Sequence, residues 1–331
     1  MKEYKNFFIK TLIIFLASIV ILPLAIITIG GHFIAKNVYS KGAAHVNYWI
    51  ETKNNHAKEL NKKGNKIVFL SGSNTLHGLN SKYATELTGL PILNYGVHAD
   101  FGTYIFEKVK DILKDGDIVV MPLEYNYYAE DSDSALPSPF AEYIISYDKS
   151  YYDKAPVMRK IGLVSFMAQY YIAHPKTIHE MQLVSDEYKT QLNEYGDFIG
   201  HNGTTENFSE HAKYMTITEN IPKKYNKFAL YKFIQYCKKH DIAIYATLPN
   251  MYHSKDYTAD EMKAFENIKN FYEEQGVFFI GDITSGSYDD RLLFNDTGYH
   301  TNEKGTELRT NWFIDNILSL DEVKNGINYE T

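Results

Sequence analysis

The chain has 331 residues, of which 34 are Lys or Arg and 41 are Asp or Glu, so its formal net charge is −7. Hydrophobic residues make up 44% of it and charged residues 23%, which is usual for a globular protein and excludes a wholly disordered or collagen-like chain. The mild acidity and the lack of a basic run argue against a nucleic-acid-binding protein. A single cysteine, Cys237, excludes an intrachain disulfide and a multi-cysteine metal site.

The first segment of the chain predicts a membrane anchor. Residues 11–35 contain no Asp, Glu, Lys or Arg, and about 20 apolar residues suffice to cross a bilayer as a helix. Three lysines against one glutamate precede this run, so the positive-inside rule keeps the N-terminus cytoplasmic. A cleaved signal peptide is the alternative, but its apolar region usually has about 7–15 residues. We therefore expect an uncleaved single-pass anchor in the cell membrane, with the remainder of the chain extracytoplasmic.

Short apolar strands alternate with helices after the anchor. The predicted strands span residues 66–71, 91–95, 117–123, 242–248 and 277–280. The predicted helices between and after them span residues 102–114, 227–239, 259–275 and 301–318. This alternation predicts an α/β fold with three layers, in which a central parallel sheet is covered by helices on both faces.

A long excursion interrupts the alternation at about residues 127–226, between the third and fourth predicted strands. A structureless loop of this length is uncommon in a compact domain, so we expect an inserted helical subdomain or lid, with helices near residues 157–173 and 178–193. The expected organisation is an anchor over residues 1–35, a polar helical stalk over 36–64, and an α/β domain over 65–331 that carries this insertion.

Polar residues follow the predicted strands, and ligands of open α/β sheets bind beyond the carboxyl ends of the strands. Ser73 lies in a Gly-Ser-Asn turn after the first strand, near backbone N–H groups and the start of a helix. Gly96 ends the second strand, where a glycine lets a backbone N–H approach a reacting oxygen. Asp296 and His300 precede the last helix. A serine, a histidine and a carboxylate at one sheet edge are the ingredients of base-activated nucleophilic acyl transfer.

Each of these motifs also has a purely structural interpretation. Gly-Ser-Asn is an ordinary turn or helix cap, Asp296 can close an Asx-turn, and His300 can cap the adjacent helix. Their joint order along the chain is what favours a catalytic site. His77 and His98, close to the same predicted edge, can line its pocket. The run at residues 174–180 lacks the His-Glu-x-x-His spacing of a zinc site, so we expect no metal and no other cofactor.

The arrangement resembles the SGNH hydrolase superfamily, in which the serine follows the first strand and the aspartate and histidine precede the closing helix. Gly72-Ser73-Asn74 stands where that family usually has Gly-Asp-Ser. It is similar to the exported branch that includes the alginate- and cellulose-acetylation proteins and the lipoteichoic-acid D-alanylation protein. The run LNEYGDF at residues 192–198 and the closing FNDTGYHTNEKGTELRT are also similar to that branch. In outline, the resemblance covers residues 65–126 and 227–318.

The chain departs from the family pattern in two places. The final block is usually Asp-x-x-His, whereas His300 comes four residues after Asp296. The usual Gly-x-Asn-Asp block is missing, and PLEYN at residues 122–126 occupies that strand end. The oxyanion-hole donors that the resemblance implies are therefore Gly96 together with Asn74 or Asn126.

The resemblance implies a membrane-anchored, extracytoplasmic serine acyltransferase or esterase that adds or removes O-acyl groups, above all acetyl, on a cell-envelope or secreted polysaccharide. Ser73 would be the nucleophile, His300 the base and Asp296 the carboxylate that orients it. A membrane-bound O-acyltransferase that donates the acyl group would be a further partner. Transferase and esterase share the first half-reaction, so these residues do not separate them. The alternative from another class is a non-catalytic glycan-binding or scaffolding component of a polysaccharide assembly or export machine, which a long Ser73–His300 separation would favour.

Overall fold

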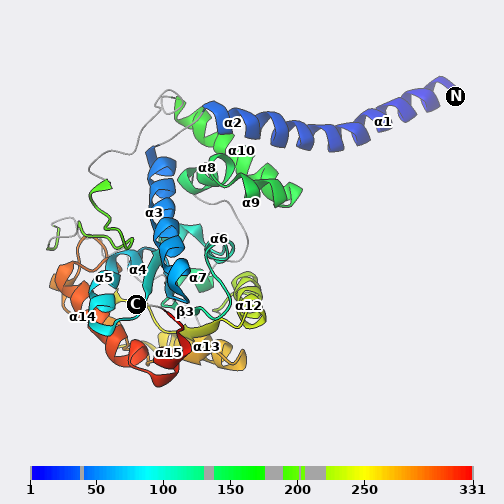
Figure 1. Ribbon diagram of the computed structural model, residues 1–331. Helices are drawn as coiled ribbons and strands as arrows, with labels where there is room; N and C mark the ends of the chain where they lie inside the picture. Colours follow the sequence, from blue (N-terminus) through cyan, green and yellow to red (C-terminus); the bar gives the residue numbers. More distant parts are fainter. Residues whose placement is uncertain are drawn as a thin grey trace. The chain divides into compact units, whose positions relative to one another are not determined.

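The chain divides into two compact units in its computed structural model (Figure 1). The described residues are 2–37, 41–129, 138–175, 189–200, 203–205 and 221–329. The first unit comprises Met1–Asn47 and Ser134–Ser185, and the second comprises Tyr48–Asp133 and Asp186–Thr331. Of the excursion predicted at residues 127–226, Ser134–Ser185 belongs to the first unit and the rest to the second.

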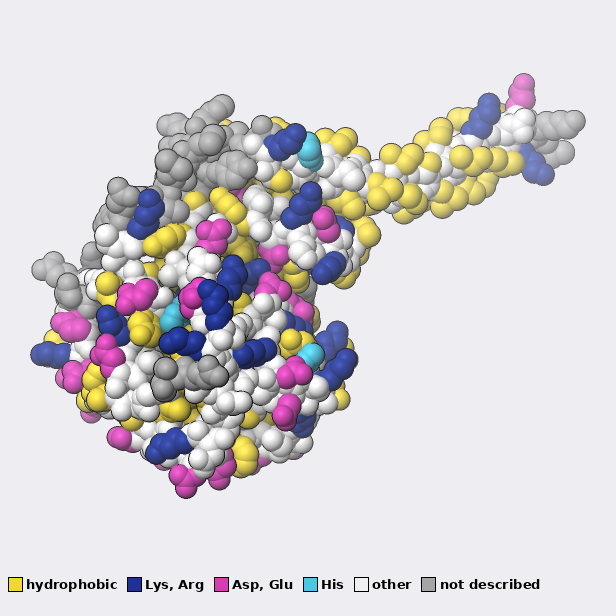
Figure 2. Space-filling model, in the orientation of Figure 1, with side chains coloured by type: hydrophobic (Ala, Val, Ile, Leu, Met, Phe, Trp, Pro, Cys, Tyr) yellow, Lys and Arg dark blue, Asp and Glu magenta, His cyan; other side chains and the backbone are white. Residues whose placement is uncertain are grey.

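The first unit contains one helix that is long and apolar enough to cross a membrane, Glu3–Lys36. It consists of α1 (Lys2–Ala25), a π-helical turn (Ile26–Gly30) and α2 (Gly31–Asn37). The π-helical turn closely follows Pro23, which removes a backbone donor from the helix. The large apolar side chains of α1 are exposed, and they form the yellow surface of this helix in Figure 2. An exposed apolar surface of this length matches the hydrocarbon core of a bilayer.

Three further helices complete the first unit, namely α8 (Ser138–Ser146), α9 (Lys149–Lys154) and α10 (Val157–Ala173). The bounds of α10 are those that the sequence predicts. The Tyr152 hydroxyl donates a hydrogen bond to the Ile27 carbonyl at 3.0 Å, which fixes α9 to the end of the apolar helix. Most of the helix predicted at residues 178–193 lies outside the described residues.

The second unit is built on a five-stranded parallel sheet with the order β2-β1-β3-β4-β6. Its strands are β1 (Ile67–Ser71), β2 (Ile92–Gly96), β3 (Ile118–Met121), β4 (Ala243–Ala246) and β6 (Phe278–Phe279). Ile67 of β1 pairs with Ile92 on one side and with Ile118 on the other. The α/β class and the parallel sheet are thus confirmed, and each strand lies within its predicted range or one residue beyond it.

Helices flank this sheet. They are α4 (Ser73–Gly78), α5 (Ser81–Thr88), α6 (Tyr104–Val109), α7 (Asn126–Ala129), α12 (Lys224–Lys239), α13 (Ala259–Glu274), α14 (Glu303–Phe313) and α15 (Asp321–Gly326). On one face of the sheet, Phe69 packs edge-on against Phe313 of α14 with ring centroids 4.8 Å apart. On the other face, the Tyr95 hydroxyl donates to Asn54 at 3.1 Å. Because successive side chains of a strand alternate between faces, these contacts place helices on both sides.

Asn54 lies on α3 (Lys41–Lys63), the helix that occupies the predicted stalk. The chain passes from the first unit to the second within this helix. In the second unit, Lys53, Ala57 and Leu60 of α3 are buried. One side of this polar segment is therefore part of the core of the α/β unit.

A second, two-stranded parallel sheet pairs β5 (Met251–Tyr252) with β7 (Ser287–Tyr288). Two-residue strands leave too little periodicity in a sequence to be predicted. In the main sheet, the direction of strand addition reverses between β1 and β3. The carboxyl ends of these two strands form the topological switch point, where open α/β sheets have their ligand crevice.

Candidate active site

The turn after β1 carries Ser73 to the switch point. β1 ends at Ser71 and α4 begins at Ser73, so Gly72 alone separates the strand from the helix. A Cβ atom on Gly72 would lie 2.6 Å from the Ala99 Cα and from Glu124 Oε1, which only a glycine avoids. The close approach of these segments fixes Ser73 at the first position of the helix.

A buried carboxylate after β3 holds this turn. Glu124 is 2% exposed, and its Oε2 accepts hydrogen bonds from the Ser71 hydroxyl at 2.7 Å and the Gly72 N–H at 2.9 Å. Its Oε1 accepts the Asn74 N–H at 2.9 Å. Burial raises the pKa of Glu124, and these donated hydrogen bonds act in the opposite direction. The sequence places Glu124 at this strand end. It gives no sign that Glu124 holds the turn after β1, because the residues that donate to it lie about 50 positions earlier in the chain.

The loop before α14 brings Asp296 and His300 together. Phe294 and Thr301 form an antiparallel bridge at its base, and the Asn295 N–H donates to the His300 carbonyl at 2.8 Å. In this tight loop His300 Nδ1 lies 2.8 Å from Asp296 Oδ1. The additional residue in Asp-x-x-x-His therefore does not prevent the pairing. Because an ionised carboxylate can only accept, Nδ1 carries the hydrogen and Nε2 is the ring nitrogen that can take a proton.

Two threonine hydroxyls hold this loop against α4. Thr301 Oγ1 and Thr306 Oγ1 both donate to the His77 carbonyl, at 2.8 Å and 2.6 Å. The His77 ring lies against the His300 ring with centroids 4.2 Å apart. His77 comes one helical turn after Ser73, on the same side of α4. The structure thus places the imidazole of His300 against the short helix that Ser73 begins.

Ser73 itself is 9% exposed, and its hydroxyl makes no hydrogen bond within the described part of the chain. The Asp296–His300 loop therefore contacts α4 at His77, one turn after Ser73, while the Ser73–His300 hydrogen bond of a closed triad is not formed. In enzymes without substrate, catalytic hydrogen bonds are often long and shorten when substrate binds. The roles of Ser73, His300 and Asp296 stay predictions.

The predicted oxyanion donors have different surroundings. The Gly96 N–H donates to Asn94 Oδ1 at 2.9 Å, and Asn74 Nδ2 donates to the Pro122 carbonyl at 3.0 Å. The Gly96 N–H and the Asn74 amide would each have to give up this hydrogen bond in order to donate to an oxyanion. Asn126 begins α7, and its buried Oδ1 has no hydrogen-bond partner in the described part of the chain. The N–H of Ser73, in the first turn of α4, has no acceptor within its helix.

Part of the predicted insertion forms a wall of the site. Residues 192–198 make a turn closed by a bridge between Leu192 and Phe198. Asp197 accepts hydrogen bonds from Ser81 at 2.5 Å and from Asn94 Nδ2 at 3.1 Å, which ties the turn to the end of β2. The Phe198 ring packs edge-on against His77, with centroids 4.4 Å apart. His77 therefore contacts both this turn and His300.

Lys53 of α3 supports the same turn. Its buried Nζ donates to the carbonyls of Asn94 at 3.0 Å and Gly196 at 2.5 Å. Burial lowers the pKa of Lys53 to about 7, against the opposing effect of Asp197. A lysine in a polar helix is usually solvent-exposed, so the sequence alone gives no sign of this role.

A third histidine lies at this sheet edge. His98 follows β2, and burial lowers its pKa; the charge of Asp100 opposes this shift and the charge of His300 adds to it. The charges of His98 and His300 therefore interact, and the place of His98 in the pocket stays a prediction. The site is therefore rich in imidazoles, of which only His300 is paired with Asp296.

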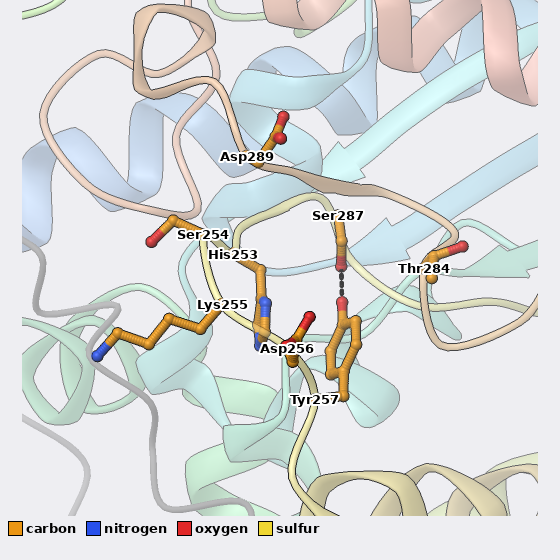
Figure 3. A pocket seen from close by; sticks show the side chains of 8 residues that line it. All are labelled: His253, Ser254, Lys255, Asp256, Tyr257, Thr284, Ser287 and Asp289. Carbon is orange, nitrogen blue, oxygen red and sulfur yellow. Dashed lines mark hydrogen bonds between the residues drawn. The ribbon is translucent and has the colours of Figure 1, made fainter.

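A polar cavity of about 620 Å³ lies next to the Asp296–His300 loop. The Tyr252 N–H donates to the Gly298 carbonyl at 2.7 Å, so β5 runs along this loop. The cavity is lined by His253, Ser254, Lys255, Asp256, Tyr257, Thr284, Ser287 and Asp289 (Figure 3). The Tyr257 ring stacks on His253 with centroids 4.0 Å apart, and its hydroxyl is hydrogen-bonded to Ser287. None of these residues is predicted as a site residue from the sequence, because short loops far apart in the chain assemble the cavity.

Elsewhere in the described part of the chain, neither a metal site nor a reactive thiol is found. Within the described residues, no three His, Cys, Asp or Glu side chains converge as a metal site. In the run at residues 174–180, His174 follows α10, and residues 176–188 lie outside the described ranges. Burial raises the pKa of the Cys237 thiol to about 12, which disfavours the nucleophilic thiolate.

Comparison with known proteins assigns the chain to no family. No protein-family model matches it, and no curated protein matches it. The fold and the site define the class: an α/β protein whose parallel sheet carries, at its switch point, an Asp–His pair against a helix that begins with serine. The resemblance to SGNH hydrolases rests on the motifs of the sequence.

We predict that Glu124 makes stability depend on pH. Because the pKa of Glu124 is higher in the native state than its ordinary value of 4.5, the native state binds the proton more tightly than the unfolded state does. This contribution to the free energy of unfolding is complete below pH 4.5 and is lost as pH rises through the native pKa. Glu124→Gln cannot ionise, so the free energy of unfolding of the variant should fall less over this range. Urea denaturation followed by tryptophan fluorescence measures both slopes. Identical slopes in the variant and the wild type would contradict the prediction.

Lys53 should give a dependence of opposite sign. The pKa of Lys53 is about 7 in the native state and ordinarily 10.5, so the unfolded state binds the proton more tightly. The free energy of unfolding should therefore rise as pH increases from about 7 to about 10.5. Lys53→Met should remove this rise in the same denaturation measurement. Lys62→Met, which changes a 67%-exposed lysine of the same helix, is the matched control and should keep it. A rise of equal slope in Lys53→Met would exclude Lys53 as its source.

Proposed function

We propose that the chain is a membrane-anchored SGNH-like serine acyltransferase or esterase that acts on O-acyl groups, above all acetyl, of a cell-envelope or secreted polysaccharide. One observation carries the proposal: His300 Nδ1 lies 2.8 Å from Asp296 Oδ1 in a loop fastened to the helix that begins with Ser73. A histidine oriented by a carboxylate beside a serine is the arrangement that activates a hydroxyl nucleophile. The apolar helix Glu3–Lys36 supplies the anchor.

In the first half-reaction, Ser73 Oγ attacks the carbonyl carbon of the ester while His300 Nε2 takes the hydroxyl proton. Asp296 holds the imidazole in the required tautomer and stabilises the imidazolium. The tetrahedral intermediate collapses, the C–O bond to the leaving alcohol breaks, and His300 returns the proton to that oxygen. The product is acyl-Ser73.

In the second half-reaction, an acceptor hydroxyl attacks the acyl carbon and His300 takes its proton. Water as acceptor releases the free acid, and a sugar hydroxyl forms a new ester. The Ser73 N–H is the donor closest to the developing oxyanion, and the Gly96 N–H or the Asn74 or Asn126 amide would be the second. Loss of one such donor typically raises the barrier by about 2.7–4 kcal/mol.

The polar cavity supplies a place for a sugar acceptor. It begins at His253, directly after the residue that is hydrogen-bonded to the Asp296–His300 loop, and its volume of about 620 Å³ exceeds that of one sugar unit. Ser254, Thr284 and Ser287 offer hydroxyls, and Asp256 and Asp289 offer carboxylates, which suit a ligand with many hydroxyl groups. The proposed partners are the polysaccharide and, for acyl supply, a membrane-bound O-acyltransferase.

A second candidate is a non-catalytic glycan-binding or scaffolding component of a polysaccharide assembly or export machine. The observation that favours it is the absence of a hydrogen bond on the Ser73 hydroxyl within the described residues. This candidate requires that glycan binding be the same in the wild type and in Ser73→Ala, and that neither turn over an ester.

We predict that the full chain in detergent releases the chromophore of an aryl acetate and that Ser73→Ala and His300→Ala abolish the release, because each removes a reacting group. Asp296→Asn should reduce it about ten-thousandfold, since the histidine loses its orienting carboxylate. The matched control is His240→Ala, which removes a His–Asp pair of the same 2.8 Å length, to Asp115, away from Ser73. Unchanged turnover in Ser73→Ala would reject the serine mechanism.

Substitutions in the polar cavity should affect acyl transfer to sugar more than hydrolysis. With a series of oligosaccharides as acceptors, Tyr257→Ala and Asp289→Asn should lower acyl transfer to sugar about tenfold relative to hydrolysis, because each removes a side chain of the cavity that the proposal assigns to the acceptor and none that reacts. Mass spectrometry of the acylated sugar, alongside release of free acid, gives the ratio. An equal fall in both products would place these residues in support of the fold instead.

A further inference from the structure

One face of α12 is basic and aromatic. The helix contains five lysines and no Asp or Glu, although the chain as a whole has a net charge of −7. Its exposed residues are Lys224, Lys227, Phe228, Tyr231, Lys232, Gln235, Lys238 and Lys239. We refer to these eight residues as the α12 face. They recur three and four positions apart, so they form one stripe, while Leu230, Phe233 and Ile234 point into the core.

An apolar groove of about 860 Å³ adjoins this stripe, between α12 and the end of α13. It is lined by Pro222, Lys224, Tyr225, Lys227, Phe228, Tyr231, Phe271 and Gln275. Phe228 is 56% exposed and Tyr231 is 43% exposed. Aromatic side chains this open to water in a cluster mark a surface that binds another apolar body.

Two lysines of the α12 face contact aromatic rings. Lys227 Nζ lies 5.6 Å from the centroid of Phe271, and Lys232 Nζ lies 4.3 Å from that of Phe228. Among the described residues, no carboxylate forms an ion pair with any of the five lysines. Within the described residues, the face therefore offers positive charge without an ion-pair partner beside exposed aromatic rings. The sequence does not present it as a basic run, because the lysines are spread over 16 residues.

We propose that the α12 face binds the surface of an anionic lipid bilayer, with the lysine ammonium groups against lipid phosphates and with Phe228 and Tyr231 in the interfacial layer. Lysines with aromatic residues on one side of a helix are the pattern of a segment that lies on a membrane surface. The chain carries its own candidate membrane helix, so the bilayer is present at high effective concentration. The proposal does not depend on the proposed enzymatic activity.

A soluble polyanion explains this face less well than a bilayer does. It would account for the lysines, but it would gain nothing from an exposed phenylalanine or from the groove beside it. An anionic bilayer satisfies both, because it offers phosphates at its surface and apolar chains just beneath them.

The test uses the full chain in nanodiscs, one set of phosphatidylcholine and one in which about a third of the lipid is phosphatidylglycerol. Gln235→Cys carries a bimane label on the α12 face, and the native Cys237 is buried and takes no label. Lipids with a nitroxide near the headgroup report proximity by quenching. We expect clear quenching in the anionic nanodiscs, little in the zwitterionic ones, and little for a label at Leu87→Cys, which is exposed on α5.

Lys224→Glu/Lys227→Glu reverses the charge of two lysines and should weaken the lipid contact about tenfold or more. Phe228→Ser/Tyr231→Ser should also abolish most of the quenching. The control Lys82→Glu/Lys269→Glu makes the same change in net charge at exposed lysines elsewhere and should leave the quenching unchanged.

Equal quenching in both lipids, or quenching that survives both double variants, overturns the proposal. Absence of quenching in anionic nanodiscs also overturns it. If the full chain then binds dextran sulfate in a way that Lys224→Glu/Lys227→Glu removes, the face binds a soluble polyanion instead.

Discussion

The Glu124 carboxylate is the constraint on which the rest of the site depends. Backbone N–H groups at the start of a helix have no partner within the helix, and those of Gly72 and Asn74 are buried. Glu124 accepts both, and it accepts the Ser71 hydroxyl as well, so the chain can turn from β1 into α4 within one residue. Without this acceptor the turn would bury unsatisfied donors, which is costly. The carboxylate thereby fixes the position of Ser73 at the cost of burying a charge.

Every other element of the site is positioned against α4. The end of β2 holds it through Asn94, which donates to the Thr75 carbonyl, and the turn at residues 192–198 contacts it through Phe198. The loop of Asp296 and His300 is fastened to the His77 carbonyl of α4 by Thr301 and Thr306. Three segments from different parts of the chain thus contact the six residues of α4. This convergence accounts for an oriented Asp–His pair beside a serine and supports the proposed acyl transfer.

Two features of the chain are suited to contact with a membrane, and different interactions are responsible in each. The helix Glu3–Lys36 is long and apolar enough to cross a membrane. The α12 face combines exposed rings with lysines that form no ion pair among the described residues, and the proposed partner is an interface that offers charge and apolar surface together. An enzyme that acts on envelope polysaccharide would benefit from both, because the first would anchor the chain and the second would hold the α/β unit close to the bilayer.

The sequence by itself determined the apolar helix, the α/β class, the strand positions and the sheet edge that carries Ser73, Asp296 and His300, because hydrophobic periodicity and turn residues act over short stretches of chain. Only the tertiary structure decided that the excursion at residues 127–226 divides between two units and that Asp296 pairs with His300 across four residues. It also revealed the buried roles of Glu124 and Lys53. A buried charge is stabilised by partners distant in the chain, so its role has no signature in the neighbouring sequence.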